Sequence, residues 1–332
     1  MGAGSWGTAL ASLACKNFSR VRLWSHRSQI LEDIAETGEN RSYLPGIELQ
    51  SNIIPSPDLE DIVGGVSRFI VVVPSHAFRQ TCDRLQRIRS RAGSDLDPLQ
   101  LVWGTKGFEP DSGLLLSQVA AEIFPEDANF GVVSGPSFAK ETTLQMPTAL
   151  TVACRFEGEV ESVCEWFRTA TTRVYGSDDL IGVQLGGAIK NVMAIAAGIG
   201  DGLGYGANAR AALITRGLVE LNRLCKALGG KPETIMGLTG VGDLVLTCTD
   251  NQSRNRRFGM GLGAGKSIQA IKEEIGQEIE GINTTQVLFN KSKDLNLTMP
   301  ITEQVYQIIF EGKNPAHAVN SLLQRTAKSE NE

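Results

Sequence analysis

An ammonium group and an amide interrupt a small, apolar run at residues 185–194, which reads Leu-Gly-Gly-Ala-Ile-Lys-Asn-Val-Met-Ala. These small and apolar residues predict a helix that packs closely against its neighbours and carries Lys190 and Asn191. A buried ammonium is costly unless it is paired or used, and burial lowers the pKa of a lysine toward the range of an acid–base catalyst. The pattern indicates a catalytic Lys190. The alternative is a lysine that reaches the helix surface.

A carboxylate that could pair with a buried lysine occurs in the segment 240–247, Gly-Val-Gly-Asp-Leu-Val-Leu-Thr. Asp243 and Thr247 are four residues apart, so a helix would place both on one face. A carboxylate partner moderates the effect of burial on a lysine pKa. We therefore expect this segment to contribute to the same chemistry as Lys190.

Two polar turns follow predicted strands. Lys106 lies in Gly-Thr-Lys-Gly after one strand, at the sheet edge where open α/β folds bind ligands, although a surface lysine in a turn has the same spacing. Gly135 and Pro136 follow another strand and leave backbone groups and the Ser137 hydroxyl free to meet a polar ligand. Ser137 could equally cap a helix in an ordinary turn, and spacing alone does not separate the two.

A basic, polar stretch, Ser-Arg-Asn-Arg-Arg, covers residues 253–257. Arginine forks match phosphate oxygens bidentately, and serine and asparagine add further donors. The stretch indicates an anion site around Arg254. A solvated basic loop is the alternative.

The spacing Gly2-x-Gly4-x-x-Gly7 is typical of the turn beneath a dinucleotide pyrophosphate. One glycine makes the turn, one lets the phosphates approach, and one packs the helix closely. The following residues favour a helix, whose N-terminal N–H groups would hold the anion. Alone the pattern is weak, because a glycine-rich turn has the same spacing, and its support comes from the surrounding elements.

The residues at the end of the second strand determine whether a protein of this kind prefers NAD(H) or NADP(H). A carboxylate there binds the ribose 2′-hydroxyl, whereas a basic residue accommodates a 2′-phosphate. This chain has Ser25, His26 and Arg27 and no carboxylate. We predict NADP(H) as the better cofactor, with NAD(H) tolerated; an exposed basic turn is the alternative.

The elements that must position these residues change in type along the chain. The first half alternates predicted strands with helical segments, and the second half shows long helical patterns, including 213–228, 267–275 and 301–310. The fold class is α/β, a Rossmann-like doubly wound parallel sheet followed by an all-helical C-terminal domain. We place the NAD(P)-binding domain at 1–177 and the helical substrate and catalytic domain at 178–332. The expected strands cover residues 21–24, 68–73, 99–103, 131–134 and 149–153.

One element is missing from this pattern. A Rossmann unit needs a buried strand before its first glycine, and here only Met1 precedes Gly2. The central first strand cannot form from these residues. We expect either a start assigned too late, which we favour, or a fold interrupted at its centre, with reduced stability in both cases.

Composition excludes several classes of protein. The 332 residues carry a formal charge of −5 with dispersed basic residues, which predicts no nucleic-acid partner. Apolar residues make up 42% and charged residues 21%, as in folded globular proteins. The six scattered cysteines form no metal-like cluster, and we expect no metal, no membrane span, no signal peptide and a cytoplasmic location.

The motifs together resemble those of the bacterial-type NAD(P)-dependent sn-glycerol-3-phosphate dehydrogenase family. Gly-Ala-Gly-Ser-Trp-Gly-Thr-Ala, Thr-Lys-Gly, Ser-Gly-Pro-Ser-Phe-Ala, Ala-Ile-Lys-Asn-Val, Gly-Asp-Leu, Ser-Arg-Asn and Glu-Gly occur in the family's order over essentially the whole chain. The resemblance implies hydride transfer between the nicotinamide and C2 of dihydroxyacetone phosphate or sn-glycerol 3-phosphate. It also implies a supply of glycerol 3-phosphate for phospholipid synthesis, and a homodimer.

The resemblance assigns roles to individual residues. Lys190 resembles the proton donor and acceptor for the C2 oxygen, supported by Lys106, Asn191, Asp243 and Thr247. Arg254 and Asn255 resemble a phosphate clamp, while Lys106, Gly135, Ser137, Lys190, Asp243 and Ser253 match other substrate-contacting positions. The matching cofactor positions are Gly2, Gly4, Ser5, Trp6, Gly7, His26, Arg27, Tyr43, Lys106, Ala139, Arg254, Glu278 and Glu280.

Two rival functions remain open at this point. An NADP-dependent hydroxy-acid dehydrogenase of similar two-domain architecture, acting on a sugar acid or pantoate, would use Arg254 on a carboxylate almost as well as on a phosphate. A non-catalytic dinucleotide sensor could use the same fold, because a fold alone does not fix function. The presence of Lys190 together with Asp243 argues against the sensor.

Overall fold

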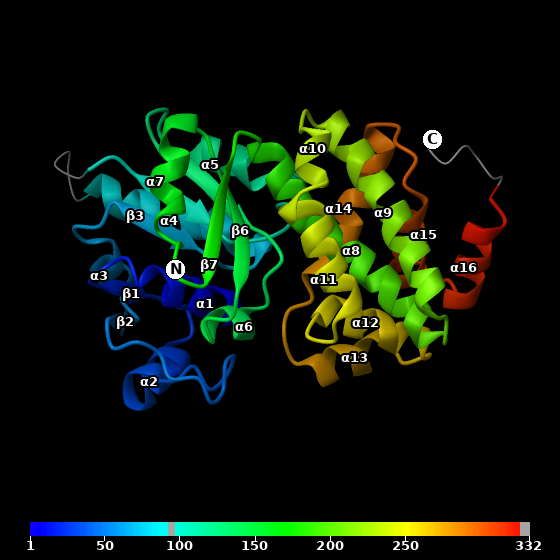
Figure 1. The fold of residues 1–332 in the computed structure, drawn as a ribbon, viewed down its shortest axis with the longest axis horizontal. Coiled ribbons are helices and arrows are strands. Elements are labelled where there is room, and N and C mark those ends of the chain that lie inside the picture. The colour runs from blue at the N-terminus through cyan, green and yellow to red at the C-terminus, as the bar shows by residue number, and fades with distance from the viewer. Residues whose placement is uncertain (92–96, 326–332) are drawn as a thin grey trace. The chain divides into compact units, whose positions relative to one another are not determined.

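The computed structural model describes residues 1–91 and 97–325, and the chain folds as two compact units. Unit 1 holds Met1–Gly187 and Gly229–Asp243; unit 2 holds Ala188–Leu228 and the chain from Leu244 onward. The polypeptide therefore enters unit 2, returns to unit 1 and enters unit 2 again. Figure 1 colours the chain by residue number, from blue at the N-terminus to red at the C-terminus.

Unit 1 is built from strands and mostly short helices. Its strands are β1 (Val21–Leu23), β2 (Ile53–Pro55), β3 (Arg68–Val71), β4 (Gln100–Trp103), β5 (Asn129–Ser134), β6 (Thr148–Cys154) and β7 (Thr172–Ser177). Its helices are α1 (Ser5–Ala14), α2 (Ser28–Thr37), α3 (Leu59–Val63), α4 (Phe78–Arg91), α5 (Leu116–Ile123), α6 (Ala139–Thr143), α7 (Val160–Cys164) and α10 (Pro232–Ile235).

Within the described ranges, unit 2 is helical. Helix α8 (Leu180–Gly202) begins in unit 1 and continues into unit 2, and α11 (Asp243–Thr249) follows a π-helical turn at Leu238–Gly242. The remaining helices are α9 (Ala207–Ala227), α12 (Arg254–Gly263), α13 (Ile268–Ile275), α14 (Glu280–Asp294), α15 (Pro300–Phe310) and α16 (Pro315–Leu323). The predicted change from alternating elements to helices is confirmed. Strands β2 and β7 lie where the sequence predicts no strand.

The main sheet of unit 1 has the strand order β3-β4-β5-β6-β7 over the residues that the structure describes. All of its neighbouring strands run parallel except β5 and β6. The chain turns directly after β5 at Gly135, whose φ of 138° is a conformation that L side chains rarely adopt. After helix α6, strand β6 runs antiparallel to β5, which departs from the fully parallel sheet predicted above.

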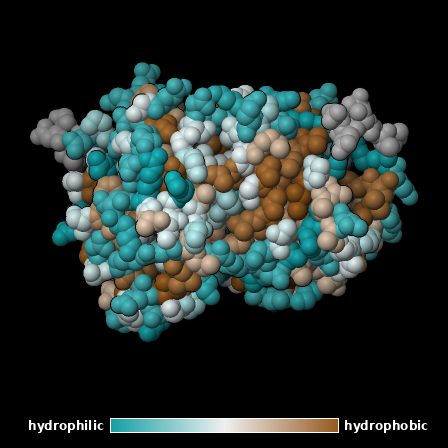
Figure 2. Space-filling model, viewed as in Figure 1, coloured by the Kyte–Doolittle hydropathy of each residue, from teal (hydrophilic) through white to brown (hydrophobic). Residues whose placement is uncertain are grey.

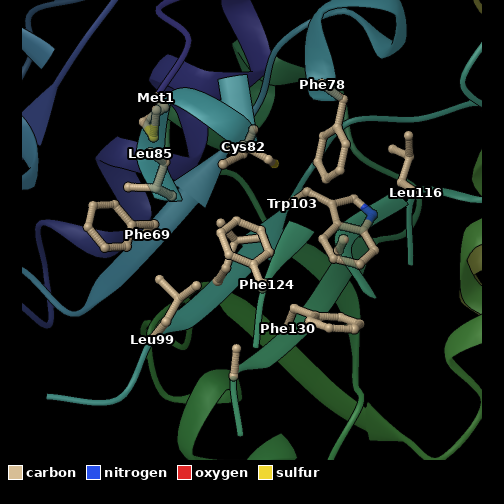
Figure 3. Packing of buried hydrophobic residues seen from close by; sticks show 14 of the residues in the cluster. Met1, Phe69, Phe78, Cys82, Leu85, Leu99, Trp103, Leu116, Phe124 and Phe130 are labelled. Atoms are coloured by element: carbon tan, nitrogen blue, oxygen red, sulfur yellow. The ribbon is translucent and has the colours of Figure 1, made fainter. Parts of the chain in front are cut away.

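The central strands β4, β5 and β6 are buried on both faces, which explains their largely apolar sequences, whereas alternate residues of the edge strand β7 are exposed. Trp103 of β4 packs edge-on against Phe78 of α4, with ring centroids 5.5 Å apart, inside the cluster drawn in Figure 3. The neighbouring Val102 belongs to a different cluster, together with Val133 of β5. This alternation fixes the register of each strand, because a slip of one residue would exchange the faces.

The sheet of unit 1 is interrupted beside Met1. Strands β1 and β2 form a separate parallel pair, and the described residues contain no strand before α1. The Met1 amino group donates to the Ile70 carbonyl at 2.7 Å, the Val72 amide donates to the Met1 carbonyl at 2.8 Å, and the Gly2 amide donates to the Trp24 carbonyl at 2.7 Å. A groove of about 330 Å³ lies beside Met1 and is lined by residues of β1 and β3.

Helix α8 is the long apolar element of the chain. By length and composition alone it could cross a membrane, but 89% of its most apolar window is buried inside the structure. The core helices of globular proteins have this character. Lys190 and Asn191 are 7% and 5% exposed on it, so the sequence correctly predicted that these two polar residues lie on a packed helix.

A buried carboxylate caps one helix of unit 2. Glu220 of α9 is 1% exposed and accepts hydrogen bonds from the Ile301 amide at 2.5 Å and from the Thr302 amide and hydroxyl at 3.2 and 2.9 Å. These groups belong to the first turn of α15, where N–H groups otherwise lack partners. Burial raises the pKa of the Glu220 carboxyl to about 7.

Candidate active site

The three glycines of the N-terminal loop have distinct surroundings. A Cβ atom at Gly2, whose φ is 101°, would lie 2.2 Å from the Val72 carbonyl oxygen, and one at Gly7 would lie 1.9 Å from the Gly2 carbonyl oxygen. Gly4, the N-cap of α1, has no atom within 4 Å of that position. Two glycines thus permit the turn and the close packing, and the third leaves open space at a helix N-terminus. This arrangement fits a dinucleotide pyrophosphate.

The basic residues after the second predicted strand are held in part by a tyrosine. Arg27 is the N-cap residue of α2, and its Nη1 donates to the Tyr43 hydroxyl at 3.3 Å. Arg27 is exposed, and its side chain reaches a phenol rather than a carboxylate. His26 beside it is also exposed. The structure thus brings together two of the residues predicted to bind the cofactor.

Other predicted cofactor residues lie on α1 and α6, which pack against each other. Ser5 and Trp6 begin α1, and Ala139 begins α6. A Cβ at Gly104 would lie 2.7 Å from Trp6 Nε1, so the turn after β4 packs directly on this indole. In the turn after β5, the Ser137 hydroxyl donates to the Gly135 carbonyl at 3.1 Å.

Lys106 and Asp243 form a close ion pair inside unit 1. Lys106 Nζ lies 2.6 Å from Asp243 Oδ2, and the two side chains are 16% and 0% exposed. Lys106 follows β4 at the carboxyl edge of the sheet, and a Cβ at Gly187 would lie 3.4 Å from its Cγ. The lysine is therefore held both by its charge partner and along its stem. Removing one member would leave a buried charge without its partner, which is strongly destabilising.

Lys190 and Thr247 meet inside unit 2. Lys190 Nζ donates to Thr247 Oγ1 at 3.1 Å, and both residues are buried. The hydroxyl supplies an acceptor that orients the ammonium group without neutralising it. The sequence analysis placed both residues in one chemical group, and the structure brings them into contact.

An amide network in unit 2 links three helices. Asn255 Nδ2 of α12 donates to Asn191 Oδ1 of α8 at 3.0 Å, and the Gly281 amide of α14 donates to Asn255 Oδ1 at 3.0 Å. A Cβ at Gly281 would lie 2.6 Å from that same oxygen, so glycine is required there. Asn255 thus connects the residue after Lys190 to the start of α14, where Glu280 lies.

The basic stretch forms the N-terminus of α12. Ser253 is its N-cap, and its hydroxyl oxygen accepts from the Arg256 amide at 3.2 Å; Arg254 is the first helical residue. The N-terminus of a ten-residue helix favours anions, which agrees with the predicted anion site. Glu278, by contrast, is exposed in the segment before α14, and its role stays a prediction.

Sequence reasoning missed Arg256 and Asp201. Arg256 is buried and Asp201 is only slightly exposed, and the two form an ion pair of 2.5 Å in unit 2. Arg256 lies in the basic stretch, where nothing in the spacing separates it from Arg254, and Asp201 belongs to none of the motifs described above. Among the described residues, no group of three His, Cys, Asp or Glu side chains could hold a metal ion.

The fold and these residue groups define a class first: a nicotinamide-dependent dehydrogenase with a dinucleotide-binding α/β unit and a helical unit. Residues 1–159 match the family described as NAD-dependent glycerol-3-phosphate dehydrogenase N-terminus, and residues 179–320 match the C-terminus of the same family. The chain belongs to the NAD-dependent glycerol-3-phosphate dehydrogenase family.

Individual relatives agree with this membership. A glycerol-3-phosphate dehydrogenase [NAD(P)+] of Thioalkalivibrio sulfidiphilus is 50% identical over 330 residues, which cover 99% of this chain and 97% of the relative. The one from Shewanella halifaxensis is 46% identical over 331 residues, or 99% and 96%. The crystal structure of glycerol-3-phosphate dehydrogenase from Coxiella burnetii is 42% identical, with a TM-score of 0.92 over 98% of this chain and 97% of that one.

A ketopantoate reductase from Ralstonia eutropha has a TM-score of 0.58 and 16% identity, with 98% of each chain covered. This likeness concerns the fold alone. The comparisons therefore favour the glycerol-3-phosphate dehydrogenase prediction over the hydroxy-acid alternative.

Proposed function

We propose that this chain interconverts dihydroxyacetone phosphate and sn-glycerol 3-phosphate with NAD(P)H. The observation that carries the proposal is the buried Lys190, held by Thr247 and followed by Asn191, whose amide is bonded to Asn255 beside Arg254. A buried ammonium and an anion-binding helix N-terminus are the two groups that reduction of a phosphorylated ketone requires. The names of the relatives support the same substrate pair.

Lys190 is the proposed acid–base residue. In the direction of reduction, its ammonium donates a proton to the oxygen that develops negative charge at C2, and in the other direction the neutral amine accepts that proton. Thr247 Oγ1 orients the group, as its 3.1 Å hydrogen bond supports. When bound, the nicotinamide supplies or removes the hydride at C2.

Lys106 supplies fixed positive charge for the same oxygen in this proposal. Preorganised charge aimed at the developing oxyanion is effective because it needs no reorganisation during reaction. Asp243 keeps Lys106 in one orientation through the 2.6 Å ion pair. The two lysines thus have different roles: one moves a proton and the other stabilises charge.

The substrate's phosphate is assigned to Ser253, Arg254 and Asn255 at the start of α12, and further substrate contacts to Gly135 and Ser137. Arginine presents a planar fork that matches phosphate oxygens, and the helix N-terminus adds N–H donors. The remaining assignments keep Ser5, Trp6, His26, Tyr43, Ala139, Glu278 and Glu280 as cofactor residues.

NADP(H) is the proposed preferred cofactor, with NAD(H) accepted. Arg27 supports this preference, since it is exposed, basic and hydrogen-bonded to a phenol that competes little with a 2′-phosphate. The pyrophosphate is assigned to the open position at Gly4 and the N-terminus of α1. Running the assay with NADPH and with NADH tests the preference.

The wider assignments follow from family membership. We infer that the enzyme is cytoplasmic, supplies glycerol 3-phosphate for phospholipid synthesis and uses residues 1–177 for NAD(P) and 178–332 for substrate. We also infer a homodimer formed by the helical part. Figure 2 shows apolar side chains gathered over α9, where Leu213, Ile214 and Leu218 are only partly buried, and this surface supports a second copy as partner.

The direct test is NADPH oxidation with dihydroxyacetone phosphate, beside a panel of keto acids that includes ketopantoate. Lys190→Ala is expected to lower kcat by about 100-fold or more, the usual size of a lost acid–base group. The exposed Lys272→Ala serves as control and should leave kcat unchanged. Turnover of a keto acid alone would overturn the substrate, and near-normal turnover by Lys190→Ala would overturn the assigned base.

A further inference from the structure

We propose that Arg256, held by Asp201, is the positioning residue that sets the N-terminus of α12 for the substrate's phosphate group. The inference rests on the proposed function, because it deepens the role of residues 253–255. Arg256 does not itself touch substrate in this proposal. It acts through the backbone and side chains of the three residues before it.

All three nitrogens of the Arg256 guanidinium donate to protein acceptors. Nη2 donates to Asp201 Oδ2 at 2.5 Å, and Nε donates to the Cys248 carbonyl at 3.1 Å. Nη1 donates to Asn251 Oδ1 and to Met260 Sδ. Every nitrogen of the guanidinium is therefore engaged inside unit 2, so Arg256 has no bidentate pair of free N–H groups to offer a phosphate.

These contacts tie together the elements that surround the proposed clamp. Cys248 lies in α11, Asn251 in the loop before α12, and Asp201 near the end of α8. The Arg256 amide also donates to Ser253 Oγ, which closes the first turn of α12. The side chain and the backbone amide of Arg256 together link α8, α11 and the loop before α12 to the first turn of α12.

Asp201 is itself fixed. Its Oδ1 accepts from Arg210 Nη1 of α9 at 2.9 Å while Oδ2 accepts from Arg256. The side chains of Asp201 and Arg256 are 11% and 8% exposed, so solvent screens this pair little. A buried carboxylate with two guanidinium partners gives Arg256 a single position.

The backbones of α8 and α12 touch, so α12 has little freedom except along its own axis. On each helix two glycines four residues apart face the backbone of the other, and a Cβ on any of them would lie 2.1–2.4 Å from a carbonyl oxygen. The polar contacts of Arg256 and Asn255 prevent α12 from sliding along its axis against α8. The facing pairs are Gly198 with Gly202 on α8 and Gly259 with Gly263 on α12.

Two substitutions and one control test the inference. Arg256→Lys keeps the charge but offers one nitrogen in place of three, and Asp201→Asn keeps the shape and one acceptor oxygen while removing the charge. Arg257→Lys alters the next arginine, which is exposed, and serves as the matched control. Each protein is assayed with dihydroxyacetone phosphate, with unphosphorylated dihydroxyacetone and at varied NADPH.

Arg256→Lys is expected to raise the KM for dihydroxyacetone phosphate by about 10-fold, since a displacement of about 1 Å can cost still more. The KM for NADPH and the kcat/KM for unphosphorylated dihydroxyacetone should stay within about 2-fold, because neither depends on the phosphate site. Asp201→Asn should act in the same direction, and Arg257→Lys should change nothing. A purely structural role would lower activity with both ketones alike.

The outcomes separate the two proposals. If the unaltered enzyme turns over dihydroxyacetone phosphate but the variants lose both ketone activities equally, or lose neither, the positioning role is wrong and the function stands. If the unaltered enzyme shows no turnover of this substrate, the proposed function and this inference both fail. If Arg256→Lys does not fold, Asp201→Asn provides the test. The quantity compared is then the ratio of kcat/KM for dihydroxyacetone phosphate to kcat/KM for unphosphorylated dihydroxyacetone.

Discussion

The two units close their interiors in opposite ways. Unit 2 brings helix backbones into contact at glycines and buries the carboxylates of Glu220 and Asp201 with donors around them. Unit 1 depends on strand pairing, and that pairing stops beside Met1, where a groove separates β1 from β3. A helix satisfies its own backbone, whereas a strand needs a neighbour along its whole length.

The comparison shows where each unit is sensitive. In unit 1 the weak place is a line of backbone groups, with the Met1 amino group buried at its end. Unit 2 is sensitive at individual positions. An added methyl group at a glycine contact has no space, and removing one member of a buried ion pair leaves the other charge without solvent to compensate it. Three experiments of decreasing expected effect test this contrast.

The largest effect is expected from extending β3's free edge. Fusing about five alternating valine and isoleucine residues before Met1 would fill the groove and replace the buried amino group by an amide. We expect a gain of about 4 kcal/mol in the free energy of unfolding near pH 6, from apolar burial and because folding would no longer have to deprotonate a buried amino group. Urea unfolding measures it, with hydrogen exchange to show that the protection arises in unit 1.

The pH dependence sharpens this first experiment. Burial lowers the pKa of the Met1 amino group from 8.0 to about 5. Between these values the unfolded chain binds a proton that the folded chain does not, so stability should rise as the pH rises from about 5 to about 8. The fused strand should abolish this rise, while a glycine–serine fusion of equal length should abolish the rise without the gain from burial. Equal stability of the two fusions would show that the groove accepts no strand.

A single methyl group should produce the next largest effect. Gly198→Ala places a Cβ 2.1 Å from the Arg256 carbonyl oxygen, and this backbone atom cannot rotate away. We expect a loss of about 3 kcal/mol in thermal or urea unfolding, the upper part of the usual range for overpacking. Gly200→Ala on the same helix meets no atom within 4 Å and should instead stabilise by about 0.5 kcal/mol. Similar behaviour of the two variants would show that α8 and α12 are not in close contact.

The smallest expected effect is the contribution of Glu220 to the free energy of unfolding, which depends on pH. Its pKa is raised from 4.5 to about 7, so the folded state binds a proton that the unfolded state loses between these values. The stability contributed by this group should therefore fall as the pH rises from about 5 to about 7, on the order of 2 kcal/mol. Glu220→Gln should flatten that decline in denaturant unfolding followed by hydrogen exchange in α15. An unchanged slope would show that Glu220 remains ionised throughout.

The sequence carried much of this picture because local patterns have local causes. Strands 68–73 and 99–103 could be predicted because their residues are buried on both faces of the sheet and are therefore apolar. Lys190 could be identified because an ammonium group seldom occurs in an apolar helix. Short elements such as β2, three residues long, have too few residues for a period to appear. The antiparallel direction of β6 depends on the path of the connection through α6, which spacing does not reveal.

Pairings between distant residues were the main limit. Nothing in the sequence indicates that Asp243 lies against Lys106, or that Arg256 is the arginine of its stretch that pairs with Asp201. Such pairs depend on the tertiary path of the chain, and equivalent arginines in one basic stretch cannot be ranked without it. The site could be predicted as a set of residues, but not as a set of contacts.

The return of residues Gly229–Asp243 to unit 1 has a consequence for synthesis of the protein. Lys106 and its carboxylate partner are 137 residues apart in the chain, and all of α9 is made between them. At about 5–20 residues per second, a nascent chain carries Lys106 without its partner for on the order of ten seconds. Unit 1 therefore cannot finish folding when its N-terminal segment has been synthesised. The ribosome must first translate residues 188–228 of unit 2 and then the segment Gly229–Asp243 that completes unit 1.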